Sequence, residues 1–321
     1  MLIAMKKWIL KAIVQKTISY LPLSEKINYL FQKYVTKGVN LTDAYFIQRL
    51  ILAKDHFDAY SKFNKNAIPQ TCLELGTGWY PIVPICFFVA GSEKIYSVDI
   101  TFLTSKERIR ATVEMFIKAH KECELEKYIP INKVRFEKLV DISNNYDNLS
   151  LENILEQLHL VYLIEDARKL SLPDNSIDLV NSNNTFEHIY PKILIPILKE
   201  FKRVVSKSHG VQSHFIDMSD HFAHFDTSIN IYNFLQFSES QWRLIDNSIQ
   251  PQSRLRIDDY KKIYADLEIP IDLENFREGR LGELKTIKLS EPYSSKSLEM
   301  NTISHCHFIS YSSSSNNAAS L

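Results

Sequence analysis

The chain has 321 residues, of which 45% are hydrophobic and 24% are charged, proportions that are typical of a globular protein with a substantial core. Lysine and arginine together number 38, as do aspartate and glutamate, so the formal net charge is zero. This balance provides no basic field, and we therefore expect no nucleic-acid partner. The four scattered cysteines form no CxxC pair, which argues against a disulfide framework or a cysteine zinc site and favours a cytoplasmic protein.

Residues 1–65 are predicted to be helical, because apolar residues recur there at spacings of three and four. One helix is expected around residues 27–34, and a second follows Thr42, where Asp43 could cap its N-terminus. Lysines interrupt the apolar residues near the start, so this stretch is too broken for a bilayer span of about 20 apolar residues. We interpret residues 1–65 as a helical extension that serves as a lid or contacts a membrane surface, peripheral to the inner membrane.

From Thr71 onward, short apolar strands alternate with helices. The expected strands are TCLEL (71–75), KIYSVDI (94–100), LVYLIEDA (160–167), SIDLVNSNN (176–184) and GVQSHFIDM (210–218). The expected helices cover residues 82–90, 106–121 and 191–205, and Gly91 ends the first of them. Strands joined by helical crossovers predict a doubly wound α/β fold, in which helices cover both faces of a mostly parallel sheet.

Two segments are not explained by this alternation of strands and helices. Residues 122–160 are expected to form an insertion, and residues 222–280 a mostly helical block before the last strands. Those last strands are expected at ELKTIKL (283–289) and ISHCHFISYS (303–312), and the low-complexity residues 311–321 predict a disordered tail. We therefore expect one domain over residues 66–310, preceded by the helical extension.

The first expected strand runs directly into a turn with two glycines, Gly76 and Gly78. In an open parallel sheet, ligands bind beyond the carboxyl ends of the strands, and glycines there let backbone N–H groups approach a ligand. Asp99, at the end of the second strand, is placed to accept hydrogen bonds from the hydroxyl groups of a ribose. Pro81 replaces the third glycine of the dinucleotide fingerprint and removes an N–H from the helix start. These features predict a nucleotide-type ligand without a pyrophosphate.

The order of the motifs is similar to that of the class I S-adenosylmethionine-dependent methyltransferases. The similarity rests on LELGTGWYP (73–81), YSVDI (96–100), EDARKLSLPDNSIDLVNSNNTFEHI (165–189) and FKRVVSKSHG (201–210). It implies a Rossmann-like methyltransferase sheet and S-adenosylmethionine as the cofactor. This cofactor carries a carboxylate, an ammonium, a ribose and an adenine but no phosphate, which suits a glycine turn flanked by carboxylates.

The resemblance also implies a set of cofactor-binding residues. They comprise the acid before the turn, the turn itself, the acid of the second strand, the acidic–alanine pair that brackets the adenine, and a residue at the end of the fourth strand. These residues are Glu74, Gly76, Thr77, Gly78, Asp99, Asp166, Ala167 and Asn183. Tyr80 replaces the family's third glycine, so the loop is bulkier than the family's usual turn.

Transfer of a methyl group to an oxygen atom usually needs a base that removes the acceptor's proton. Candidate bases should lie at the carboxyl ends of the fourth and fifth strands, in NSNNTFEHI (181–189) and SHFIDMSDHFAHFD (213–226). A neutral histidine oriented by an aspartate could serve there. We predict His221 or His224 as the base first, and His188 second.

We assign no metal ligand from the sequence, although one alternative stays open. FEHI (186–189) resembles the Glu–His pair with which terminal-ribose RNA methyltransferases and some ubiquinone-pathway O-methyltransferases bind a divalent ion. Glu187, His188 and one histidine from residues 214–224 could form a mixed oxygen and nitrogen site. Asn184 replaces a further glutamate that those families carry.

The helical N-terminus, GTGWYP (76–81) and DHFAHFD (220–226) are together similar to uncharacterised methyltransferases of bacterial surface-polysaccharide gene clusters. This resemblance implies O-methylation of a sugar or a lipid-linked glycan, and small metabolites stay open as acceptors because a fold does not fix its substrate. The competing class is a non-catalytic cofactor-binding protein, which the bulky Tyr80 would suit. The sequence predicts no particular oligomeric state.

Overall fold

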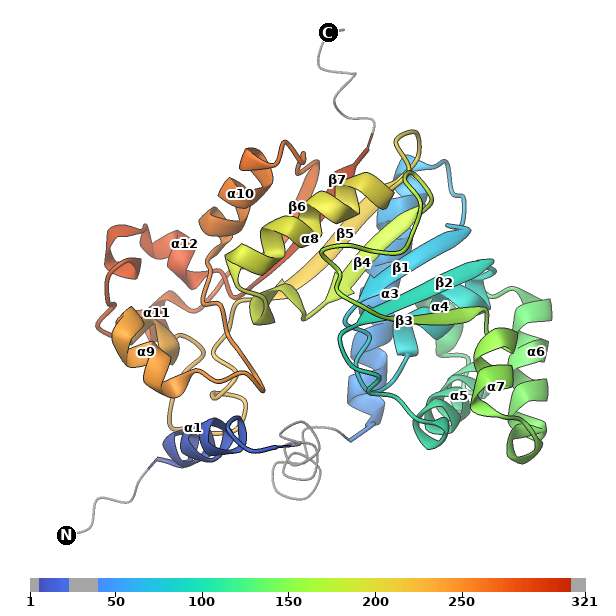
Figure 1. Cartoon of the computed structure of the whole chain (residues 1–321), viewed down its shortest axis with the longest axis horizontal. Helices are drawn as coiled ribbons and strands as arrows, with labels where there is room; N and C mark the ends of the chain where they lie inside the picture. Colours follow the sequence, from blue (N-terminus) through green and yellow to red (C-terminus); the bar gives the residue numbers. More distant parts are fainter. Residues whose placement is uncertain (1–5, 23–39, 313–321) are drawn as a thin grey trace, which may run out of the picture.

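The computed structural model describes residues 6–22 and 40–312, and within them a seven-stranded sheet forms the centre of the molecule (Figure 1). The strand order is β3-β2-β1-β4-β5-β7-β6; the first five strands are parallel, whereas β7 is antiparallel to β5 and β6. The strands are β1 (Thr71–Leu75), β2 (Lys94–Asp99), β3 (Leu160–Ile164), β4 (Leu179–Asn183), β5 (Val211–Asp217), β6 (Leu273–Arg277) and β7 (His305–Tyr311). This architecture confirms the predicted α/β fold, and strand order reverses between β1 and β4, where ligands bind in such sheets.

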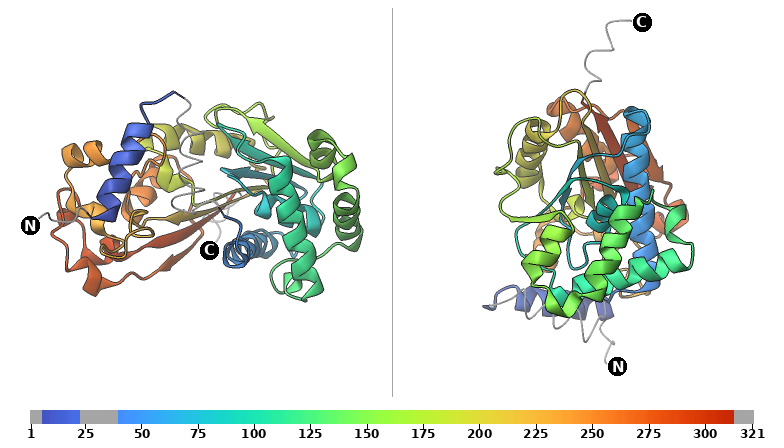
Figure 2. Two further views of the ribbon diagram at one scale, coloured as in Figure 1. Left: turned by 90° about the horizontal axis from the view of Figure 1, so that it is seen from below. Right: turned by 90° about the vertical axis from the view of Figure 1, so that its right-hand side faces the viewer.

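Helices cover both faces of the sheet (Figures 1 and 2). One face carries the first set: α3 (Asp43–Phe63), α4 (Ile82–Ala90), α5 (Lys106–Lys121), α6 (Lys133–Asn144) and α7 (Leu151–Gln157). The other carries α8 (Pro191–Val204) and α10 (Ile257–Asp266). Successive strand residues alternate between the two cores, since Cys72 packs with the first set and Leu73 with the second.

Local signals explain the bounds of the best-defined helices. Thr42 caps α3 because its side chain accepts a hydrogen bond from the N–H of Tyr45 at 3.1 Å, so Thr42 and not Asp43 is the cap. Every residue of α4 is buried, as expected for a helix that is apolar on all sides. Gly91 ends α4 in the left-handed conformation, with φ of 110°, which glycine adopts without a steric penalty.

A third apolar cluster joins the N-terminal helix α1 (Lys7–Ile18) to the chain that follows β5. Trp8 packs against Phe222 and Phe237, with ring centroids 5.9 and 5.8 Å apart. Lys16 adds hydrogen bonds to backbone carbonyls of residues 243 and 246, close to α9 (Glu239–Ile245). Figure 2 shows α1 lying across this end of the molecule, far from α5 to α7. The helix predicted around residues 27–34 lies outside the described residues.

Two sequence expectations about the last strands need correction. ELKTIKL (283–289) is not a strand: α11 (Leu281–Leu284) ends within it, and Leu284 is buried in the third cluster. The strand beside β7 is instead β6, inside the block predicted to be helical. As an edge strand it is partly or fully exposed along its length, so it carries no alternating apolar signal. The strand β7 also extends to Tyr311, into the predicted tail, and residues 313–321 are not described.

The segment predicted as an insertion, residues 122–160, belongs to the main core. Phe136, Leu139 and Ile142 of α6 are buried in the layer that packs on α4, and α7 leads directly into β3. Shorter helices complete the chain: α12 (Leu298–Thr302) and single turns at residues 125–127, 146–148, 186–188, 233–236 and 293–295. Among the residues that the structure describes, no helix has the length and apolar character needed to cross a bilayer.

Candidate functional site

The glycine turn joins β1 to α4 and is held against the neighbouring strands. Gly76 and Gly78 have φ of 76° and 72°, in the left-handed region that favours glycine. The N–H of Gly76 donates to the carbonyl of Val98 on β2, at 2.9 Å. A Cβ atom on Gly76 would lie 2.5 Å from Oγ1 of Thr185, whereas one on Gly78 would meet no described atom within 4 Å. The backbone conformation therefore favours glycine at both positions, and the close approach of Thr185 adds a second constraint at Gly76.

Glu74 is a buried carboxylate beneath this turn. Its Oε2 accepts a hydrogen bond from Thr77 at 2.8 Å, and its Oε1 accepts one from the amide of Asn183 at 3.1 Å. Ser97 donates in turn to Thr77, at 2.6 Å. Burial raises the pKa of Glu74, and the bonds from Thr77 and Asn183 oppose that rise. Three of the predicted cofactor-binding residues thus form one network that shapes the turn, with Ser97 as a member that the sequence did not suggest.

The other predicted cofactor-binding residues lie at the same edge of the sheet. Asp99 ends β2, and its backbone carbonyl accepts from the N–H of Glu165, just past β3, at 3.2 Å. The next residue, Asp166, has a half-exposed side chain that pairs with Arg168, and this pairing lowers the pKa of Asp166. Ala167 is buried. The structure therefore brings the carboxyl ends of β1, β2, β3 and β4 together, as the predicted site requires.

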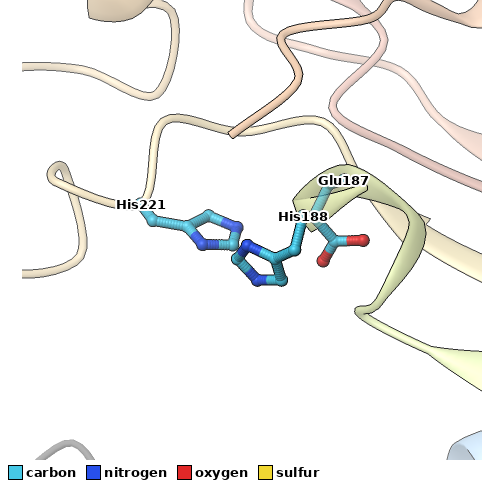
Figure 3. A group of neighbouring side chains, drawn as sticks. All are labelled: Glu187, His188 and His221. Carbon is cyan, nitrogen blue, oxygen red and sulfur yellow. The ribbon is translucent and has the colours of Figure 1, made fainter. Parts of the chain in front are cut away.

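The candidate catalytic histidines gather next to this edge, beyond the ends of β4 and β5. Glu187 and His188 lie in the turn after β4, and His221 lies in the loop after β5 (Figure 3). One potential ligand atom from each of the three lies within 4.8 Å of the others. The rings of His188 and His221 are 4.8 Å apart, and that of His224 stacks 5.5 Å from His221 on the outer side.

His221 is paired with a buried aspartate. Its Nε2 lies 3.6 Å from Oδ2 of Asp217, an ion-pair contact that is too long for a hydrogen bond. Burial works to lower the pKa of His221, but the Asp217 carboxylate outweighs burial, and the pKa is raised. Asp217 is also held by the N–H of Ser219 at 2.8 Å, and His305 lies 3.4 Å away. The predicted orienting aspartate is therefore present, but the raised pKa favours the charged imidazolium over the predicted neutral ring, so His221 could act as a base only above that pKa.

His188 is oriented by the backbone. Its Nδ1 donates to the carbonyl oxygen of Pro251 at 2.6 Å, which leaves the lone pair on Nε2. Burial lowers the pKa of His188 to about 4, so the ring is neutral at pH 7. His224, by contrast, is exposed, and its Nε2 contacts the hydroxyl of Ser219 at 3.3 Å. Of the two histidines predicted first, His221 therefore has the better-defined partner.

Glu187 is a buried acid without a hydrogen-bond partner. Its side chain is 5% exposed, and neither carboxylate oxygen has a hydrogen-bond partner among the described residues. Burial raises its pKa to about 8. A cavity of about 10 Å³, roughly the space of one water molecule, lies beside it and is lined also by Asp217 and Gln252. Buried polar side-chain atoms are usually hydrogen-bonded, so Glu187 is an exception among the described residues.

Distant parts of the chain close over the histidines. The N–H of His221 donates to Gln252 at 3.0 Å, and Gln250 reaches Nδ1 of the same ring at 3.5 Å. Gln15 of α1 donates to Gln250 at 3.1 Å, so α1 contacts a residue that itself contacts His221. These glutamines could not be predicted from the sequence, because residues 250–252 lie in an irregular segment with no motif. Folding of the whole chain brings Gln250 and Gln252 next to His221.

Comparison with known proteins supports the fold. Residues 134–210 match the family described as methyltransferase domain; this match includes Asp166, Asn183 and His188 but begins after the glycine turn. No curated protein sequence matches the chain at a significant level.

Solved structures resemble the chain loosely. A Pyrococcus horikoshii protein, PH0226, has a TM-score of 0.47 at 13% identity, over 88% of this chain and 97% of its own. A Methanosarcina mazei SAM-dependent methyltransferase has a TM-score of 0.41 at 13% identity, over 77% of this chain and 94% of its own. The geranyl diphosphate C-methyltransferase of Streptomyces coelicolor has a TM-score of 0.42 at 10% identity, over 83% of this chain and 79% of its own. These likenesses are too loose to support a substrate. The match over residues 134–210 and the mostly parallel sheet together support an enzyme of the methyltransferase type.

Proposed function

We propose that the chain transfers the methyl group of S-adenosylmethionine to an oxygen atom of its acceptor. The glycine turn and Glu74 would hold the cofactor at the end of β1, Asp99 would bind the ribose hydroxyl groups, and Asp166 with Ala167 would bracket the adenine. The cofactor supplies an electrophilic methyl group when it is bound. The protein's task is then to align the acceptor oxygen with that group and to remove its proton.

The observation that carries the proposal is the pair of Asp217 and His221 at the end of β5. A histidine that is buried beside a carboxylate, next to the edge where the cofactor is expected, has the features of a general base. The carboxylate orients the ring and stabilises the imidazolium that forms when the proton is taken up. His188, which is neutral and has a free Nε2 lone pair, stays the second candidate for this role.

The acceptor that we propose is a sugar or a lipid-linked glycan. Support comes from the sequence resemblance and from α1, which closes one side of the histidine cluster while its outer face is apolar. Leu10 and Ile13 are each 52% exposed on that outer face, and Tyr20, in the turn just after α1, is 76% exposed. Lys6 and Lys7 are exposed at the start of the helix. Such a helix suits the surface of an anionic membrane, which carries lipid-linked sugars. Sedimentation with anionic vesicles tests this contact, and Ile13→Asp should abolish it.

A second candidate is metal-assisted O-methylation, which the cluster of Glu187, His188 and His221 specifically favours. These residues offer one carboxylate and two imidazoles, a donor set that suits a divalent ion such as Mn²⁺ or Zn²⁺. The unpartnered oxygens of Glu187 fit this use, as does the backbone carbonyl that fixes the ring of His188. When bound, such an ion would lower the pKa of the acceptor hydroxyl. His221 cannot use one lone pair both as a base and as a ligand, so the two candidates exclude each other.

A direct test supplies S-adenosylmethionine with a labelled methyl group and a panel of acceptors that contains free sugars, lipid-linked glycans and small hydroxylated metabolites. We expect label to enter a hydroxyl group of a glycan, and the methylated atom to be identified by mass spectrometry and NMR. If wild-type protein binds the cofactor but methylates nothing, the chain is a non-catalytic binding protein, the class that Tyr80 would suit. Labelling of nitrogen or carbon atoms alone would contradict the proposal.

A further inference from the structure

A line of buried side chains crosses the sheet from β7 to the glycine turn. Nε2 of His307 lies 2.7 Å from Oγ of Ser213, which lies 2.7 Å from Nδ1 of His56. Nε2 of His56 then lies 3.1 Å from Oδ1 of Asn183, whose Nδ2 donates to Glu74 at 3.1 Å. The line therefore connects three strands and α3 to the carboxylate beneath the turn.

The hydrogen bonds in this line can run in only one direction. The ionised Glu74 carboxylate accepts at both oxygens, and in that form Asn183 must turn its amide nitrogen toward Glu74 and its oxygen toward His56. His56 therefore carries its proton on Nε2, and its Nδ1 accepts from the hydroxyl of Ser213. Ser213 can then only accept from Nε2–H of His307. Every donor in the line points toward Glu74.

No solvent competes with these bonds. His56 and Ser213 are fully buried, and Asn183, His307 and Glu74 are each 4% exposed. Burial lowers the pKa of His56 well below its usual value, so the ring is neutral and keeps one acceptor and one donor nitrogen. In such surroundings an unpaired polar atom is strongly unfavourable, which favours the single arrangement that pairs them all.

We infer that His56 is a positioning residue of the cofactor site: its Nε2–H fixes the amide of Asn183, which in turn fixes the Glu74 carboxylate beneath the glycine turn. This inference rests on the proposed binding of S-adenosylmethionine at that turn. Without the donor on His56, the amide of Asn183 can rotate and present its oxygen to Glu74, where two acceptors repel each other. The helix α3 lies outside the residues that match the methyltransferase family, yet it would determine the geometry of the cofactor site.

The test measures S-adenosylmethionine binding by calorimetry for the wild type, His56→Ala, His56→Gln and Phe57→Leu. We expect His56→Ala to raise the Kd by about tenfold or more, equivalent to about 1.4 kcal/mol. Gln reaches the position of Nε2 with an amide N–H, so His56→Gln should restore the Kd to within about threefold of the wild type, roughly 0.6 kcal/mol. Phe57 is the buried neighbour of His56 in the α3 core and controls for lost stability, so its variant should bind as the wild type does.

Two outcomes would overturn the inference: a Kd for His56→Ala that matches the wild type, or an equal loss of affinity in Phe57→Leu. A second measurement needs no cofactor. Nitrogen-15 NMR of the imidazole rings in the wild type should show His56 in the Nε2–H form, and the Nδ1–H form would contradict the directed line. If the wild type fails to bind S-adenosylmethionine, the proposed function fails, and the NMR result still decides whether His56 orients Asn183.

Discussion

The two halves of the candidate site are built in different ways. On the cofactor side, Glu74 and Thr77 bond within one short segment, and their partners Ser97 and Asn183 come from the two strands next to β1. On the acceptor side, the cluster around His221 draws on the turn after β4, the loop after β5, residues 250–252 and α1. The first half is built from the sheet and from α3, which packs on it, whereas the second depends on how the whole chain closes.

Because of this difference, we expect substitutions in one half of the site to leave the other half intact. A cofactor shared by many enzymes can be held by a turn that any sheet of this type provides. The acceptor side can be altered through α1 or the loop after β5 without touching β1, β2 or β4. Variants should therefore separate into those that lose cofactor binding and those that lose turnover or acceptor affinity.

The largest effect is expected on the acceptor side, from His221→Ala. Loss of the base should lower kcat by about 10²–10⁴, while the Kd for S-adenosylmethionine stays unchanged. Asp217→Asn should give a smaller loss, because the ring keeps its lone pair but loses its orienting charge. The measurement is a steady-state assay with the labelled donor. His209→Ala, which removes an exposed histidine at the opposite end of β5, is the matched control.

The same assay distinguishes the metal-assisted mechanism from the mechanism in which His221 is the base. Under the base mechanism, activity survives dialysis against EDTA, and His224→Ala is far less damaging than His221→Ala. The metal-assisted mechanism predicts that activity is lost in EDTA and recovers on addition of Mn²⁺ or Zn²⁺. It also predicts that Glu187→Gln abolishes metal binding, and these results together would contradict the base mechanism. If His224→Ala lowers activity as much as His221→Ala does, His224 would be assigned as the base.

The next largest effect concerns the glycine turn, through Gly76→Ala. The left-handed backbone and the overlap with Thr185 should together lower the free energy of unfolding by about 2–5 kcal/mol, with loss of cofactor binding. Gly78→Ala shares the left-handed conformation but has open space around it, so it should cost only about 1–2 kcal/mol. Chemical denaturation measures both variants, and equal losses would show that Thr185 does not constrain the turn.

A smaller effect should follow from loosening α1 with Trp8→Ala. Trp8 holds α1 against Phe222 and Phe237, so its removal should raise the acceptor KM about tenfold, equivalent to about 1.4 kcal/mol, and leave cofactor binding intact. Val134→Ala, which shortens an exposed apolar side chain on α6, far from α1, is the control. A rise in the Kd for S-adenosylmethionine in Trp8→Ala would show that α1 serves both halves of the site.

An effect that needs neither cofactor nor acceptor is a pH dependence of stability from His214, on β5 between the two halves. Its ring is fully buried against Phe186, and burial lowers its pKa to about 3. The unfolded chain takes up a proton near pH 6.5, and the folded chain does not. The stability contributed by neutral His214 is therefore complete above pH 6.5 and falls by about 1.4 kcal/mol per pH unit as the pH drops toward 3. Urea denaturation between pH 7 and 4 should show a shallower fall for His214→Phe, and an unchanged slope would contradict this account.

The sequence predicted the cofactor half well because its signals are local. The strand β1, the glycine turn, α4 and β2 lie where the apolar runs and glycines place them, within one residue at each end. The edge strand β6 was missed because its exposed residues show no alternation, and the strand predicted at 283–289 failed because its apolar residues pack under α1 and α9 instead.

The histidine motifs indicated two loops that the structure brings together, but they could not choose among the histidines in those loops. The partners that separate His221 from His224 are Asp217, Gln250 and Gln252, and the last two carry no motif. His56 was overlooked for a related reason, because a single histidine within an apolar helix pattern gives no sign of its buried partners. Such contacts between distant segments become visible only in three dimensions.

The measurement that tests the central claim most directly is calorimetric titration of S-adenosylmethionine into the wild type and Asp99→Ala. We expect the wild type to bind in the low-micromolar range, about −7 to −8 kcal/mol, and Asp99→Ala to lose this affinity because the ribose hydroxyl groups lose their acceptor. Absence of binding in well-folded wild-type protein, or equal binding in Asp99→Ala, would contradict a cofactor site at the carboxyl ends of β1 and β2.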